Sequence, residues 1–130
     1  MQGTGCANGK MSLLAAACLL VPHWSVALAQ TTGEGLNRDL LIQAIEASAE
    51  SRCPVPLMSN ELAEACEADR VTRGTRLHAF GHLQTVQWTG VSQTPLGLAE
   101  EYDALFENGR LTWFISADQD GRICMLWSMG

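Results

Sequence analysis

Two histidines have the spacing of a metal site but lack its other parts. His78 and His82 stand four residues apart, which on a helix would place two imidazoles on one face, as zinc ligation requires. Ala79 stands where a zinc protease would have Glu, Gly81 interrupts the helix, and the sequence places no third ligand. We therefore expect no metal here and interpret the histidines as the end of a helix.

A second candidate is the acidic segment around Asp103. Glu101 and Asp103 alternate along an expected strand, so they would share one of its faces. An inward carboxyl group with a raised pKa, or His78, could serve as the general base of an isomerase, cyclase or dehydratase. Solvation of the strand face is the simpler explanation. An enzyme with Asp103, Glu101 and His78 as catalytic residues is therefore our alternative interpretation.

Composition and missing motifs exclude several function classes. The chain has fourteen acidic and eight basic residues, a formal net charge of −6, and no basic stripe. This balance argues against binding to nucleic acid or to anionic membranes. No phosphate-binding loop, dinucleotide fingerprint or nucleophile elbow occurs, so no cofactor is expected.

The N-terminus predicts export. The apolar run 11–20 has the length of a signal-peptide core and is too short to span a bilayer. Pro22 follows the run, and Ala27-Leu28-Ala29 forms a cleavage site. We therefore expect a signal peptide over residues 1–29, a flexible leader over 30–35, and a periplasmic or secreted mature chain. Lipidation at Cys18 stays open as an alternative.

Cleavage would change the number of cysteines. It would remove Cys6 and Cys18 and leave Cys53, Cys66 and Cys124. An odd number in an exported chain allows one internal disulfide and one free thiol. We predict a disulfide between Cys53 and Cys66 that joins two helices, and a free Cys124 that serves as a small apolar residue in the last strand.

Residues 36–130 are expected to form a single α+β domain in which N-terminal helices pack on a four-stranded antiparallel sheet. Helical spacing predicts a helix over 37–51, and Ser59 should cap a second helix that Gly74 closes. A short third helix is expected over 75–80. The expected strands cover 83–88, 98–106, 111–117 and 122–128, with a loop over 90–97.

Two turn signals divide the C-terminal third into a meander. Asn108-Gly109 is expected to form a two-residue turn with positive φ at both positions. The segment from Asp118 to Gly121 lacks the length and final Glu of a calcium loop and predicts a second hairpin turn.

Alternation places apolar residues on both faces of the sheet. In the last strand it assigns Ile123, Met125 and Trp127 to one face. Helices can cover one face, so the other should be open to a ligand, a partner or a second copy of the chain. The expected ligand- or partner-binding residues are aromatic: Trp88, Tyr102, Trp113, Phe114 and Trp127.

Turn glycines and aromatic residues between Gly81 and Trp127 also follow a family pattern. They are Gly81, Trp88 with Gly90, Tyr102 with Phe106, Asn108 and Gly109, Trp113 with Ile115, and Asp120 with Gly121 and Ile123. In these positions the segment resembles small bacterial exported domains of the cystatin-like, nuclear-transport-factor-2-like α+β cone superfamily. The resemblance implies a cone-like meander and no particular activity.

The function expected from the sequence is therefore that of an exported, non-catalytic binding module. Its open sheet face would hold an unknown protein partner, a second copy of the chain as a homodimer, or a small apolar ligand. Neither nucleic acid nor a membrane span is expected.

Overall fold

The structure is a computed structural model that describes Cys6 and residues 35–130. Several predictions concern residues outside the described ones. They are the signal peptide apart from Cys6, its cleavage site after Ala29, the lipidation alternative at Cys18 and most of the leader. Among those described, no helix is long and apolar enough to cross a membrane.

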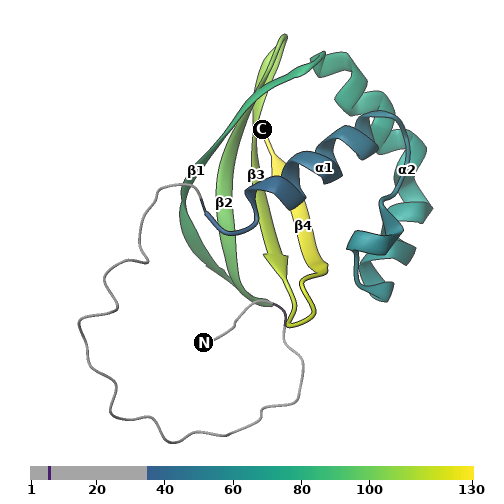
Figure 1. The fold of residues 1–130 in the computed structure, drawn as a ribbon. Helices are drawn as coiled ribbons and strands as arrows, with labels where there is room; N and C mark the ends of the chain where they lie inside the picture. Colours follow the sequence, from purple (N-terminus) through teal and green to yellow (C-terminus); the bar gives the residue numbers. More distant parts are fainter. Residues whose placement is uncertain (1–5, 7–34) are drawn as a thin grey trace, which may run out of the picture.

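Two helices and a four-stranded antiparallel sheet make up the described chain, which confirms the α+β class (Figure 1). Helices α1 and α2 come first, joined through the short 3₁₀ helix η2, and strands β1 to β4 then follow in the spatial order β1-β2-β3-β4. Their bounds are Arg38–Ala49 for α1, Val55–Leu57 for η2, Asn60–Phe80 for α2, Leu83–Thr94 for β1, Gly97–Phe106 for β2, Gly109–Ala117 for β3 and Ile123–Met129 for β4. Buried side chains of both helices join one core with the face of the sheet that we call the helix side.

Helix α2 is longer than the sequence predicts. Ser59 caps it as expected, because its Oγ accepts a hydrogen bond from the Leu62 N–H at 3.2 Å. The predicted end at Gly74 is wrong, since the helix continues to Phe80 and bends instead at Asp69, where φ is −127° and ψ is 21°. Gly74 serves close packing: a Cβ there would lie 2.1 Å from Ser51 Oγ, at the end of α1.

Strand β1 is also longer than predicted. The sequence places a loop over residues 90–97, but β1 runs to Thr94 and pairs with β2 along this length. The register shifts between Trp88 and Gly90, so one extra residue is accommodated as a bulge and the strand continues beyond it. The connection between the first two strands is therefore a tight turn at Pro95 and Leu96.

The first predicted turn is wrong in both place and conformation. Phe106 pairs with Gly109, so the two turn residues are Glu107 and Asn108. Gly109 and Asn108 are not among the described residues with positive φ. The turn is held on the C-terminus of α2, where the Asn108 N–H donates to the Phe80 carbonyl at 2.9 Å. A side chain at Gly109 would meet the Phe80 ring, with its Cβ 2.8 Å from Cε1.

The second predicted turn is confirmed. Gly121 has φ of 81°, and its N–H donates to the Asp118 carbonyl at 2.9 Å. The Asp118 carboxylate also accepts from the backbone N–H groups of Asp120 at 2.9 Å and Arg122 at 3.0 Å. An Asp and a Gly at these two positions therefore specify the turn.

Strand β4 presents its residues differently from the predicted alternation. Ser116 pairs with Met125 and Ala117 with Ile123, so Cys124 is an extra residue in the ladder. Ile123 is fully buried on the helix side, whereas Met125 and Trp127 pair with residues of the opposite face, which we call the outer face. The prediction that Ile123, Met125 and Trp127 share one face is wrong, because this bulge reverses the alternation.

Candidate ligand-binding groove

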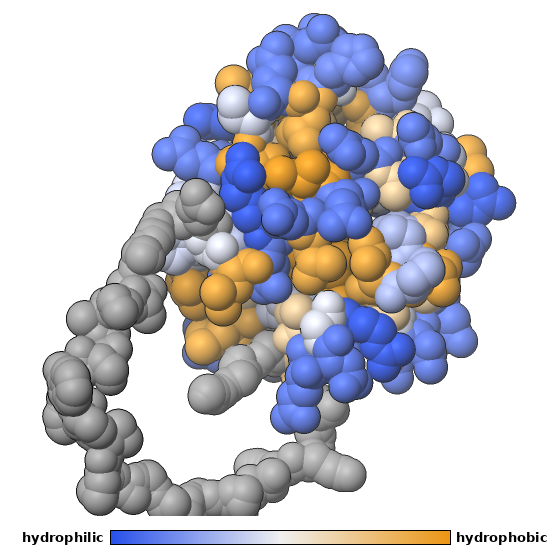
Figure 2. Space-filling model, in the orientation of Figure 1, coloured by the Kyte–Doolittle hydropathy of each residue, from blue (hydrophilic) through white to orange (hydrophobic). Residues whose placement is uncertain are grey.

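A groove of about 320 Å³ opens between α2 and strands β3 and β4 on the helix side of the sheet. The sheet contributes Leu111, Trp113 and Leu126 to it, with Trp127 and Ser128 toward the end of β4. Figure 1 shows α2 running beside β4, and Figure 2 shows hydrophobic surface between hydrophilic side chains in the same view. Its volume is at the lower end of the range of about 300–1,000 Å³ usual for small-molecule sites.

The helix wall of the groove is apolar near the sheet and charged at the rim. Leu62, Leu77 and Phe80 of α2 line the groove and pack against the core. Helical spacing places these residues on the side of α2 that faces the sheet. Asp69, Arg73 and Arg76 of the same helix also line the groove and add the charged groups.

Arg73 is held in place by the structure around it. Its guanidinium pairs with the Asp69 carboxylate, donates to the Cys66 carbonyl at 3.1 Å and contacts Cys66 Sγ at 2.7 Å. The disulfide between Cys53 and Cys66 is present, as predicted, and joins the α1–α2 connection, ahead of η2, to α2. Arg73 is therefore a fixed, charge-balanced part of the rim.

Arg76, one turn further along α2, has a different environment. It is exposed, and the described residues offer it neither a hydrogen bond nor an ion pair. A guanidinium without a counter-charge at the edge of an apolar cavity can pair with an anionic group of a bound molecule.

The predicted binding residues are divided between the two faces of the sheet. Tyr102 and Trp113 lie in the core on the helix side, and Trp88 packs against that core. Trp113 is only 3% exposed and lines the groove, and its Nε1 has no hydrogen-bond partner among the described residues. Phe114 and Trp127 stack on the outer face, with ring centroids 4.2 Å apart. Of the predicted residues, Trp113 lines the groove on the helix side, and Trp127 borders it at the edge strand β4 although its ring stacks on the outer face.

Tyr102 has a structural role. Its hydroxyl donates to a Glu100 carboxylate oxygen at 2.7 Å, and the same carboxylate accepts from the Leu36 and Asn37 N–H groups at 2.7 and 2.8 Å. Burial first, and then the hydrogen bond to Glu100, raise the pKa of Tyr102 well above its ordinary value of 10.0. The network anchors the start of α1 to β2. No local sequence pattern indicates this use of Glu100.

The acidic residues of the alternative enzyme interpretation lie on the outer face. The Asp103 carboxylate accepts from Thr112 Oγ1 at 3.1 Å, and Glu101 accepts from Ser92 Oγ at 2.9 Å. Neither residue lines the groove, and His78 lies on α2 at a different cavity. The structure therefore does not bring Asp103, Glu101 and His78 together.

The two histidines line this second cavity, of about 580 Å³, where α1, the end of α2 and the start of β1 meet. Glu46, Glu50 and Glu107 line it as well, yet no group of three or more His, Cys, Asp or Glu among the described residues could hold a metal ion. The Glu107 carboxylate accepts from the backbone N–H of His82 at 2.9 Å. This contact joins the β2–β3 turn to the start of β1.

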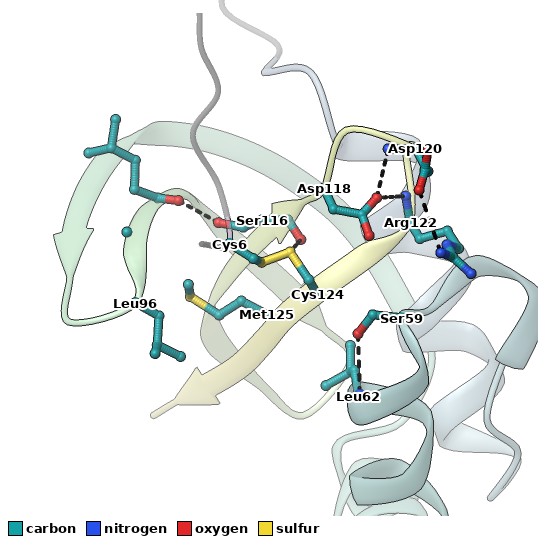
Figure 3. The surroundings of a disulfide bond; sticks show 12 residues. Cys6, Ser59, Leu62, Leu96, Ser116, Asp118, Asp120, Arg122, Cys124 and Met125 are labelled. Carbon is teal, nitrogen blue, oxygen red and sulfur yellow. Dashed lines mark hydrogen bonds and ion pairs between the residues drawn. A yellow bond between two sulfur atoms is a disulfide. The ribbon is translucent and has the colours of Figure 1, made fainter. Parts of the chain in front are cut away.

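Cys124 is not free in the structure, which contradicts the sequence-based expectation. It forms a disulfide with Cys6 (Figure 3). Cys6 packs against a small outer-face cluster of Ala99, Phe114 and Met125. The expectation failed because it assumed that Cys6 is removed with the signal peptide. A residue far away in the sequence is the partner instead.

Comparison with known proteins returned no relative. The chain matches no protein-family model, no curated protein and no solved structure. The resemblance to the cone superfamily therefore stays a prediction.

Proposed function

We propose that this chain is an exported, non-catalytic binding module whose groove between α2 and β3–β4 holds a small apolar molecule. The observation that carries the proposal is the groove itself, an open cavity of about 320 Å³ on the helix side of the sheet. Its walls are mostly apolar side chains, and burying the apolar surface of a ligand against them would supply about 25 cal/mol per Å².

Export and fold family belong to the same proposal. Residues 1–29 would act as the signal peptide, and the sheet would be a cone-like meander of the superfamily that the sequence resembles. The disulfide between Cys6 and Cys124 would then form only in a chain that keeps residues 1–29. A chain cleaved after Ala29 before it folds would have no Cys6, and its Cys124 would stay a thiol. The disulfide between Cys53 and Cys66 would remain in both forms.

Native mass spectrometry of the exported protein tests these points together. A chain that begins at Gln30, carries one free thiol and retains a small molecule agrees with the proposal. A chain that keeps residues 1–29 after export contradicts the signal peptide.

A groove-filling variant tests the site. Ala65 lines the groove and is exposed on α2, so Ala65→Phe places a ring in the cavity without disturbing the core. Ala68 is exposed on the same helix and does not line the groove, which makes Ala68→Phe the matched control. We expect Ala65→Phe to weaken binding of the neutral dye Nile red at least about tenfold, as the loss of ~1.4 kcal/mol would. Equal binding by both variants would place the apolar site elsewhere.

A further inference from the structure

We infer that the groove selects an anionic amphiphile, a molecule with an unbranched apolar tail and a single carboxylate head that pairs with Arg76. This inference rests on the proposed function and specifies its ligand. The tail would lie against Leu126 and Phe80, and the head would remain at the rim.

The charge of the lining separates this groove from the neighbouring cavities. Its charged residues are Asp69, Arg73 and Arg76, so the lining has a net positive charge. The cavity beside the two histidines is lined by three glutamates and no lysine or arginine. A third cavity, at the β2–β3 strands and the turn after β3, is lined by Glu100 and Asp118 and likewise has no basic residue. In a chain of net charge −6, the groove is thus the cavity of these three that attracts an anion.

The two arginines of the rim differ in whether their charge is already paired. Arg73 is compensated by Asp69 and fixed by the Cys66 carbonyl, so its charge is already balanced. Arg76 lines the same groove, and no such partner holds it among the described residues. One unpaired guanidinium matches one carboxylate, since the planar fork can donate two parallel hydrogen bonds to its two oxygens.

The apolar part of the groove determines the rest of the ligand. Leu62, Leu77 and Phe80 on the helix oppose Leu111 and Leu126 on the sheet. An extended apolar tail would make dispersion contacts with these walls and would be buried from water. A small hydrophilic anion, such as acetate, would contact only the rim and would bind far more weakly.

Decanoate and decanol form a matched pair of probes, because they share a tail and differ in the charged head. Isothermal titration calorimetry near neutral pH would compare them on the mature chain, the Arg76→Gln variant and an Arg70→Gln control. Arg70 is exposed on the same helix and does not line the groove. We expect decanoate to bind the unaltered chain about tenfold more tightly than decanol, and Arg76→Gln to remove this difference while leaving decanol binding unchanged.

The outcomes separate the inference from the proposed function. Equal affinities for decanol and decanoate would overturn the anionic ligand class while the apolar groove stands. The same holds if Arg70→Gln lowers decanoate affinity as much as Arg76→Gln does. Binding of neither probe would overturn both. A decanoate affinity that falls between about 50 and 500 mM salt, with decanol unaffected, would support the pairing with an exposed guanidinium.

Discussion

Gly109 at the start of β3 allows a test of how the sheet is joined to α2. Gly109→Val should destabilise the domain because the new side chain meets Phe80, the last residue of α2. An ideal Cβ at position 109 would lie 2.8 Å from Cε1 and 2.9 Å from Cδ1 of the Phe80 ring. Separations this short force atoms to move. Gly109 has no positive φ, so steric contact and not backbone strain is the expected cause.

The surroundings of Phe80 determine the magnitude. Its ring packs against Phe106 at a centroid distance of 5.6 Å, and its carbonyl accepts from the Asn108 N–H at 2.9 Å. These contacts hinder the ring from moving aside. Overpacking of this kind costs about 1–3 kcal/mol. For a domain of this size, each kcal/mol lowers Tm by about 4–8 °C, so a fall of at least about 4 °C is expected.

Thermal unfolding followed by circular dichroism measures the effect, and a double-mutant cycle identifies its cause. In a Phe80→Ala background the penalty of Gly109→Val should shrink by about 0.5–3 kcal/mol, because the clashing ring is gone. The exposed His78→Ala and His82→Ala variants serve as controls and should change stability by no more than about 0.5 kcal/mol. An equal penalty in both backgrounds would refute the packing explanation. Histidine variants that lose more stability than Gly109→Val, with rescue by added metal, would indicate a metalloprotein instead.

Two further predictions concern the disulfide between Cys53 and Cys66 and the buried hydroxyl of Tyr102. In the mature chain over residues 30–130, which has no Cys6, replacing Cys53 and Cys66 together by Ala should cost about 3 kcal/mol, the loop-closure value for a separation of 13 residues. Reductant should lower the Tm of this mature chain but not of its double variant. Tyr102 has a raised pKa, so its contribution is complete below the unfolded value of 10.0 and is lost as the pH rises above it, where the unfolded chain ionises first. The free energy of unfolding, measured with urea, should therefore fall more between about pH 9 and 11 in the unaltered chain than in Tyr102→Phe. An equal fall in both proteins would contradict the buried hydroxyl. Since Tyr102 is the single tyrosine, absorbance of tyrosinate should appear only on unfolding in this range.

Local chemistry explains which parts of the fold could be predicted. Ser59 precedes a helix and caps it, and Asp118 with Gly121 forms a turn through bonds within five residues. The pairing of Cys53 with Cys66 follows from two cysteines on either side of a helix–helix corner. Each signal and its consequence lie close together in the sequence. Such features depend little on the rest of the fold.

The errors occur where a distant segment decides the outcome. Gly74 has the residue type of a helix end, but it is needed where α2 crosses the end of α1 at Ser51. Asn108-Gly109 has the composition of a primed turn, yet Phe80 takes the space beside Gly109 and the turn shifts by one residue. The bulge at Cys124 reverses the alternation in β4. None of these partners can be identified from the local sequence.

The groove follows from the same long-range contacts, which is why aromatic residues alone were a poor guide to it. Gly74 lets α2 approach α1 closely, and the bend at Asp69 changes the direction of the helix within the stretch that lines the groove. The helix thus rests on α1 and on the turn at Asn108, and a cavity remains beside β4. Arginines spaced three residues apart on α2 are an ordinary pattern for the C-terminal half of a helix, where positive charge is favoured. Only the position of α2 over β3 and β4 turns that pattern into a rim with an unpaired cation above an apolar floor.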